Sequence, residues 1–335
     1  MTASATTVDR PSAAAGIIGR FGRNNAWTLS LLGFLAALLV FTKVVNPYYS
    51  LTSFQFTATA VLPLALAAVA QTVIVISGGI DLSVSSQMAL TSCVAATLMK
   101  SYPGDGLAVA IVLLTLALGF LLGAVNGALI VLTKVPDIVV TLATYFVWAG
   151  FALLVRPAPG GAAASWLEGL VVGYVGMALL PKAFVVLAVI VAVIWIPLVR
   201  SRLGLSLFAV GSNRLAAFRS GVPVSRTKFL SYAIGGLIAA FAGLSLTAST
   251  GIGTPVPEPT YVLISIGAVV LGGVSLAGGV GGVIGPIMAV VVLQLIRDDM
   301  TFMRIDPNYG LVAQGFILIG VLMVGSVIHM RRSRS

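Results

Sequence analysis

The chain has 335 residues, of which 59% are hydrophobic and only 8% are charged. A soluble domain carries roughly 25% charged residues, so this chain has too few charged residues to form the water-exposed surface of a soluble protein. Lys and Arg number 19 against 9 Asp and Glu, a net charge of +10. The basic residues lie at the ends of apolar runs, as orientation signals do in membrane proteins, and not in a patch for nucleic acid. Composition therefore excludes a soluble globular, disordered or collagen-like protein and indicates a protein of the lipid bilayer.

Ten apolar segments are candidates for crossing about 30 Å of hydrocarbon. The segments that begin at Leu82, Tyr261 and Gly282 are short or interrupted by glycine, so the count lies between eight and ten. The sequence thus predicts an all-α, polytopic membrane protein with about ten transmembrane helices. The predicted spans are 27–45, 54–76, 82–98, 106–132, 138–154, 183–199, 229–248, 261–276, 282–296 and 310–327.

The distribution of basic residues predicts the orientation. With both termini in the cytoplasm and ten spans, thirteen of the 19 Lys and Arg lie inside, as the positive-inside rule requires. Ten spans divide into five plus five, which makes an inverted repeat the expected architecture. The segment ISGGIDLSVSS after the second span resembles VLGGVSLAGGVGG in the eighth and ninth spans. We expect a cytoplasmic tail at 1–26, one transmembrane domain at 27–327 with a cytoplasmic loop at 200–228, and a basic cytoplasmic tail at 328–335.

The segment SGGIDLSVSS at 77–86 carries the most polar residues near membrane depth. Two adjacent glycines end the preceding apolar run. A carboxylate at the centre of a spanning helix costs on the order of 3 kcal/mol, so Asp81 should cap the next helix or face a cavity. With Ser83 beside it, the cap is the simpler interpretation, and contact with a transported solute is the alternative.

Other polar side chains also lie within the spans. Asn126 stands between small residues in GAVNGALI, which favours close helix packing with a hydrogen bond between helices. Three hydroxyl-bearing residues of the fifth span are spaced i, i+3 and i+4 and share one face, which suits a path for a polyhydroxylated solute or hydroxyls bonded back to their own helix. The candidate path residues are Gln71, Asp81, Ser83, Asn126, Thr141, Thr144 and Tyr145.

Motifs for catalysis are missing from the sequence. It has no G-x-x-x-x-G-K-[ST] phosphate loop, no G-x-S-x-G and no H-E-x-x-H. Cys93 and His329 each stand alone, so no cofactor and no metal is expected. Apart from Asp81 the spans are almost uncharged, whereas proton- or sodium-coupled carriers place ionisable residues there. The sequence predicts a protein that is not an enzyme and that draws on an external energy source.

The basic loop at 200–228 contains a short predicted helix. Asn213 can cap its N-terminus, and Gly221 followed by Pro223 ends it. A capped helix of about two turns in the cytoplasm suits docking to another protein, and an interfacial amphipathic helix is the alternative. The residues of this candidate segment are Asn213, Arg214, Ala216, Ala217, Arg219, Ser220 and Gly221.

Four segments in order resemble one family of transporter subunits. They are SGGIDLSVSS, LLGAVNGALIVLTKVPDIVVTLATYFVWAGFALL, GLSLFAVGSNRLAAFRSGVPVSRTKFLSYAIGGLIAAFAGL and GGVSLAGGVGGVIGP. Together they resemble the permease subunits of ATP-binding-cassette sugar importers of the ribose, xylose, galactose and autoinducer-2 class. The resemblance runs over about 54–327. The chain departs from the usual family pattern at Ser85, where Gly is common, and around 212–214.

The resemblance implies a mechanism and a set of partners. A second permease subunit, identical or different, encloses the path, and an extracytoplasmic sugar-binding protein delivers the cargo. A two-lobed cytoplasmic ATPase supplies the energy and receives 213–221 as the coupling helix. The expected location is the bacterial inner membrane, with no nucleic-acid partner. A stand-alone secondary transporter or facilitator is the alternative function, and a membrane scaffold is a third.

Overall fold

The computed structural model describes residues 26–176 and 180–306, together with 309, 312, 315, 316, 319 and 320. The predicted tails, except residue 26, and most of the predicted tenth span lie outside the described residues. Within the described part the chain forms helices and one short antiparallel hairpin, in which Tyr174 pairs with Pro181. The all-α architecture is therefore confirmed.

The helices follow the predicted spans closely. Each of the first nine predicted spans overlaps one helix, although the number of helices that cross the membrane stays a prediction: α2 (Ala26–Val45), α3 (Leu51–Ile76), α4 (Val84–Ser101), α5 (Asp105–Thr133), α6 (Asp137–Val155), α8 (Lys182–Arg200), α11 (Val224–Thr250), α12 (Pro259–Leu271) and α13 (Ile284–Phe302). The sequence did not predict α7 (Ser165–Val171), the strands β1 (Tyr174–Val175) and β2 (Leu180–Pro181), or α9 (Arg202–Ser212). By length and composition, α3, α5, α6, α8 and α11 are the described helices able to cross a membrane.

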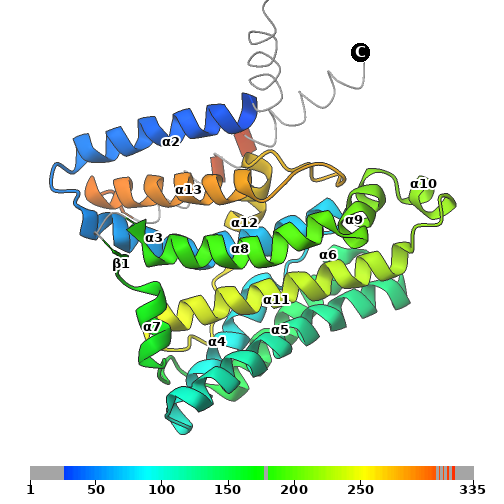
Figure 1. Ribbon diagram of the computed structural model, residues 1–335, viewed down its shortest axis with the longest axis horizontal. Helices are drawn as coiled ribbons and strands as arrows, with labels where there is room; N and C mark the ends of the chain where they lie inside the picture. The colour runs from blue at the N-terminus through cyan, green and yellow to red at the C-terminus, as the bar shows by residue number, and fades with distance from the viewer. Residues whose placement is uncertain are drawn as a thin grey trace, which may run out of the picture.

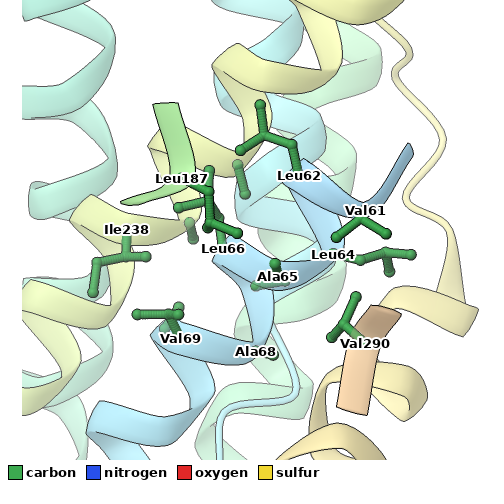
Figure 2. Close-up of a cluster of buried hydrophobic side chains, with 14 of the residues drawn as sticks. Val61, Leu62, Leu64, Ala65, Leu66, Ala68, Val69, Leu187, Ile238 and Val290 are labelled. Atoms are coloured by element: carbon green, nitrogen blue, oxygen red, sulfur yellow. The ribbon is translucent and has the colours of Figure 1, made fainter. Parts of the chain in front are cut away.

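Helix α3 forms the centre of the bundle. Its side chains from Val61 onward are buried on all sides, because α8, α11, α12 and α13 pack around it. Figure 2 shows Leu66 and Val69 of α3 beside Leu187 of α8 and Ile238 of α11. A helix that is apolar all round belongs in such a position.

Helices α5 and α11 pack through small residues. Gly119, Gly123 and Gly127 recur every fourth residue along the face of α5 that meets α11. A Cβ on Gly123 would overlap the Tyr232 carbonyl oxygen, and one on Gly119 would lie 2.6 Å from the Gly236 carbonyl oxygen. Small residues at this spacing let helix backbones approach closely in lipid. The close packing predicted for the GAVNGALI segment is thus observed.

The outer helices present apolar side chains outward. Leu154 of α6 is 80% exposed and Val193 of α8 is 68% exposed, as expected of helices that face lipid tails. At one end of the bundle lies α10 (Arg214–Arg219), and at the other end lie α7 and β1 (Figure 1).

The two glycine-rich loops that resemble each other in sequence meet at the α10 end. The backbone nitrogen of Gly279, in the loop between α12 and α13, donates to the carbonyl oxygen of Ile76 at the end of α3, 2.9 Å away. Loops related by an inverted repeat lie at opposite ends of a bundle. The similarity of these two loops therefore gives no support to the inverted repeat, which stays a prediction.

Candidate functional site

The loop between α3 and α4 holds Asp81 away from solvent. One carboxylate oxygen of Asp81 accepts hydrogen bonds from the backbone nitrogen of Ser83 at 2.7 Å and from its hydroxyl at 2.6 Å. The other accepts from the Gln87 amide at 3.1 Å. Ser83 is the N-cap residue of α4, so Asp81 closes a turn before the helix instead of bonding the first-turn amides. Asp81 therefore accepts a backbone N–H group at the start of α4, as the predicted cap requires, but from the N-cap residue Ser83 and not from the first turn of the helix.

The polar cluster around Asp81 joins three helices. The Ser83 hydroxyl accepts from Gln87 of α4 and from Asn126 of α5, each at 2.8 Å. With its amide oriented to satisfy both groups, Gln71 of α3 bonds the Asp81 backbone oxygen at 3.1 Å and nitrogen at 3.2 Å. All five side chains are fully buried. Four predicted path residues thus come together, and their hydrogen-bonding groups are largely directed at one another.

The position of Asp81 also sets its electrostatics. Asp81 lies in a loop outside the spanning helices, and burial raises the pKa of its carboxyl, while hydrogen bonds from Ser83 and Gln87 offset part of that rise. The sequence reasoning missed Gln87. Its signal was its place one helical turn after Ser83, which puts it on the same face of α4.

The predicted hydroxyl stripe on α6 is mostly satisfied within the protein. Thr141 donates to the Asp137 carbonyl oxygen at 2.9 Å and accepts from the Leu82 backbone nitrogen at 3.1 Å. The Thr144 hydroxyl donates to the Thr141 carbonyl oxygen at 3.2 Å. Tyr145 is half-buried, with its ring 5.3 Å from that of Phe146. Thr141 and Thr144 therefore bond back to their own helix, and Thr141 also fixes the α3–α4 loop.

An ion pair that the sequence did not reveal fastens the same loop. The Lys228 ammonium of α11 lies 2.6 Å from a carboxylate oxygen of Asp137, at the start of α6, and 3.1 Å from the Gly78 carbonyl oxygen. The Tyr232 hydroxyl lies 2.8 Å from the same carboxylate oxygen and 3.1 Å from the Ile80 carbonyl oxygen. The start of α6 and the start of α11 are thus locked to the α3–α4 loop.

The short cytoplasmic helix predicted from the sequence is present as α10. The Asn213 side chain caps it by accepting from the Ala216 backbone nitrogen at 2.9 Å, and Gly221 follows its end with φ of +80°. Ala217 faces inward against Val210 and Val224. Ala217, one of the seven residues of the candidate docking segment, is therefore buried within the protein itself.

The outward face of α10 is apolar and basic. Leu215 is 59% exposed and Phe218 is 68% exposed, and Arg214 and Arg219 are exposed on the same short helix. Large exposed apolar side chains beside charges on a loop are typical of a protein-binding surface. The outward side chains of Arg214, Ala216, Arg219 and Ser220 remain available to a partner.

Two cavities lie toward the end of the bundle opposite α10. One, of about 480 Å³, is lined by residues of α7 and the end of α11, including Glu168 and Ser249. The other, of about 310 Å³, lies between α3, α11, α12 and α13. Polar groups in its lining come from Thr59, Ser249, Thr250, Tyr261, Gln294 and Arg297. Neither cavity is lined by a predicted path residue.

Metal binding finds no support in the described part of the chain. Among residues 26–176 and 180–306, no group of three or more His, Cys, Asp or Glu side chains is placed to hold a metal ion.

Comparison with known proteins gives consistent relatives. Residues 53–322 match the family described as "Branched-chain amino acid transport system / permease component". The chain is 30% identical over 314 residues, covering 92% of it and 94% of the relative, to "Autoinducer 2 import system permease protein LsrD" of Escherichia coli strain K12. The proteins of the same name from Shigella flexneri and Escherichia coli O157:H7 match with the same identity and coverage. No solved structure matches the chain.

Proposed function

We propose that this chain, which belongs to the permease-component family that residues 53–322 match, carries a small polyhydroxylated solute of the sugar and autoinducer-2 class. The chain is a multi-pass inner-membrane subunit of an ATP-binding-cassette importer and not an enzyme. The observation that carries this proposal is the 30% identity to an autoinducer-2 import permease over 92% of the chain. Such a permease works with a separate ATPase and a substrate-binding protein.

The orientation follows from the charges. We propose that the α10 end of the bundle faces the cytoplasm, because the basic loop 200–228 belongs there by the positive-inside rule. Both termini then lie in the cytoplasm, flanking one permease domain at 27–327. A second permease subunit, identical or different, completes the path.

The ATPase-docking surface of the proposal is α10. Its exposed Leu215 and Phe218 fit an apolar groove, and Arg214 and Arg219 suit acidic residues at the rim of that groove. The inward packing of Ala217 on Val210 and Val224 holds this surface outward.

The cargo is proposed to contact the cavity of about 310 Å³ and not the Asp81 cluster. The Asp81 cluster is fully buried and held by hydrogen bonds within the protein. The cavity has the volume of a small-molecule site, and Tyr261, Gln294 and Arg297 in its lining supply hydrogen-bonding groups. Those groups can replace the water that a polyhydroxylated solute sheds.

An uptake experiment with labelled solutes tests the cargo class. Cells that express the chain with its ATPase and binding protein are offered labelled autoinducer-2, ribose or leucine. Saturable uptake of autoinducer-2 or ribose supports the proposal. Uptake of leucine alone contradicts it and assigns the chain to branched-chain amino acids.

A further inference from the structure

Three segments meet around four glycines at the α10 end of the bundle. These are the α3–α4 loop, the last turn of α9 and the α12–α13 loop, and we call Gly78, Gly211, Gly278 and Gly279 the glycine junction. A Cβ on Gly211 would overlap the Ile76 carbonyl oxygen and the Gly279 backbone nitrogen, the two atoms joined by the hydrogen bond between the loops. A Cβ on Gly278 would lie 2.9 Å from the Gly211 Cα and from the Gly78 nitrogen. The end of α9 therefore rests directly on both loops.

Helix α10 is rigidly joined to this end of α9. Only Asn213 separates the two helices, and it serves as the C-cap of one and the N-cap of the other. Ala217 packs against Val210 of α9 and Val224 of α11. A displacement of α10 must therefore carry Gly211 with it.

The start of α11, which follows α10 in the chain, also contacts the α3–α4 loop. Lys228, in the first turns of α11, bonds the Gly78 carbonyl oxygen at 3.1 Å and pairs with Asp137 at 2.6 Å. The side chains of this pair are only 11% and 18% exposed, so solvent screens the attraction weakly. Both flanks of α10 thus converge on Gly78, three residues before Asp81.

We propose that Gly211 and Lys228 are positioning residues that transmit a displacement of α10 to the α3–α4 and α12–α13 loops. The inference rests on the proposed function, because the displacement is supplied by an ATPase bound to α10. A side chain at 211 separates α9 from both loops. Loss of the Lys228 charge releases the Gly78 carbonyl oxygen and leaves Asp137 with the Tyr232 hydroxyl but without its ion-pair partner.

The experiment follows the α12–α13 loop directly and needs no cargo. Leu276 lies in this loop and is 37% exposed, and the single Cys93 is buried, so Leu276→Cys accepts a spin label selectively. Electron paramagnetic resonance then reports the mobility of the label in the complex with the ATPase, before and after ATP. The complex should show an ATP-dependent change in mobility.

Matched substitutions isolate the two contacts. Gly211 lies within α9 without a positive φ, so Gly211→Ala keeps the helix and adds only the overlapping methyl group. Gly150→Ala is its control, because a Cβ on Gly150 meets nothing within 4 Å. Lys228→Gln removes the ion pair, Lys228→Arg restores the charge, and Arg226→Gln removes an exposed charge nearby.

The outcomes separate the inference from the proposed function. Loss of the ATP-dependent change in Gly211→Ala and Lys228→Gln, with the ATPase still bound and the controls unaffected, supports the inference. Persistence of the change in both variants overturns it, and so does loss of ATPase binding in both, since the residues then act on docking. If Gly211→Ala does not fold, Lys228→Gln decides alone. Failure of the unsubstituted chain to bind any ATPase overturns the proposed function instead.

Discussion

Replacing Asp81 tests whether the buried polar cluster stabilises the fold. In Asp81→Ala the backbone nitrogen and the hydroxyl of Ser83 both lose their acceptor, and Gln87 loses one of two. Asp81→Asn keeps an acceptor for Ser83. Ser85→Ala is the matched control, because the buried Ser85 hydroxyl has no hydrogen-bond partner among the described residues.

The magnitude follows from the orphaned donors. Each buried donor left without an acceptor costs about 1–3 kcal/mol. The substitution also removes the cost of burying a carboxylate, which offsets part of this loss of stability. We therefore expect Asp81→Ala to lower the free energy of unfolding by about 2–4 kcal/mol. For a chain of 335 residues, whose unfolding entropy is about 0.7 kcal/mol/K, that corresponds to a fall in Tm of about 3–6 °C.

The sign for the amide variant follows from the pKa. The folded state raises the pKa of the Asp81 carboxyl, so ionisation opposes folding once the pH exceeds the pKa of the unfolded state. The neutral amide of Asp81→Asn escapes this cost at neutral pH. We therefore expect Asp81→Asn to melt close to the unsubstituted chain.

Thermal unfolding in detergent, followed by tryptophan fluorescence and by the monodisperse fraction in size exclusion, measures these changes. The expected order of Tm is unsubstituted chain, Ser85→Ala and Asp81→Asn together, then Asp81→Ala. A Tm for Asp81→Ala equal to that of Ser85→Ala would refute the reasoning that Asp81 satisfies buried donors.

Four further outcomes are expected. The isolated chain should not bind ATP in calorimetry, because it lacks a phosphate loop, and affinity below about a millimolar would contradict this. Combined Leu215→Asp and Phe218→Asp should weaken ATPase co-purification about tenfold or more, a loss of at least 1.4 kcal/mol, and full retention would exclude α10 as the docking surface. Ala217→Trp should lower the Tm, since this side chain is buried, and a native melting curve would argue against the inward packing. Tyr261→Phe and Arg297→Met should raise the KM for uptake severalfold without changing ATPase binding; unchanged uptake would move the cargo contact away from the cavity.

Helix positions were predictable because the length of an apolar run is a local property of the sequence, and five of the described helices are long and apolar enough to be the predicted spans. The cap and end of α10 were equally local, since Asn213 and Gly221 each act within a few residues. The inward direction of the Ala217 side chain could not be predicted from the sequence, because the six residues of α10 are too few to show helical periodicity. The fold was therefore predicted better than the orientation of individual side chains.

The candidate site was predicted in part. Asp81 and Asn126 were singled out as polar residues at membrane depth, but their hydrogen bonds to Ser83 depend on how α4 packs against α5. The pair of Lys228 with Asp137 joins residues far apart in sequence and has no local signal. The cavity near Tyr261 likewise needs the packing of four helices. Contacts of this kind, between segments far apart in the chain, cannot be predicted from local sequence patterns.

The central claim is that this permease moves a polyhydroxylated solute only with energy from a separate ATPase. The most direct measurement is uptake of labelled autoinducer-2 into proteoliposomes that contain the chain, with the ATPase, the binding protein and ATP each present or omitted. The account predicts accumulation above the outside concentration only in the complete mixture. Uptake by the chain alone, without ATPase or ATP, would contradict the account and identify a facilitator.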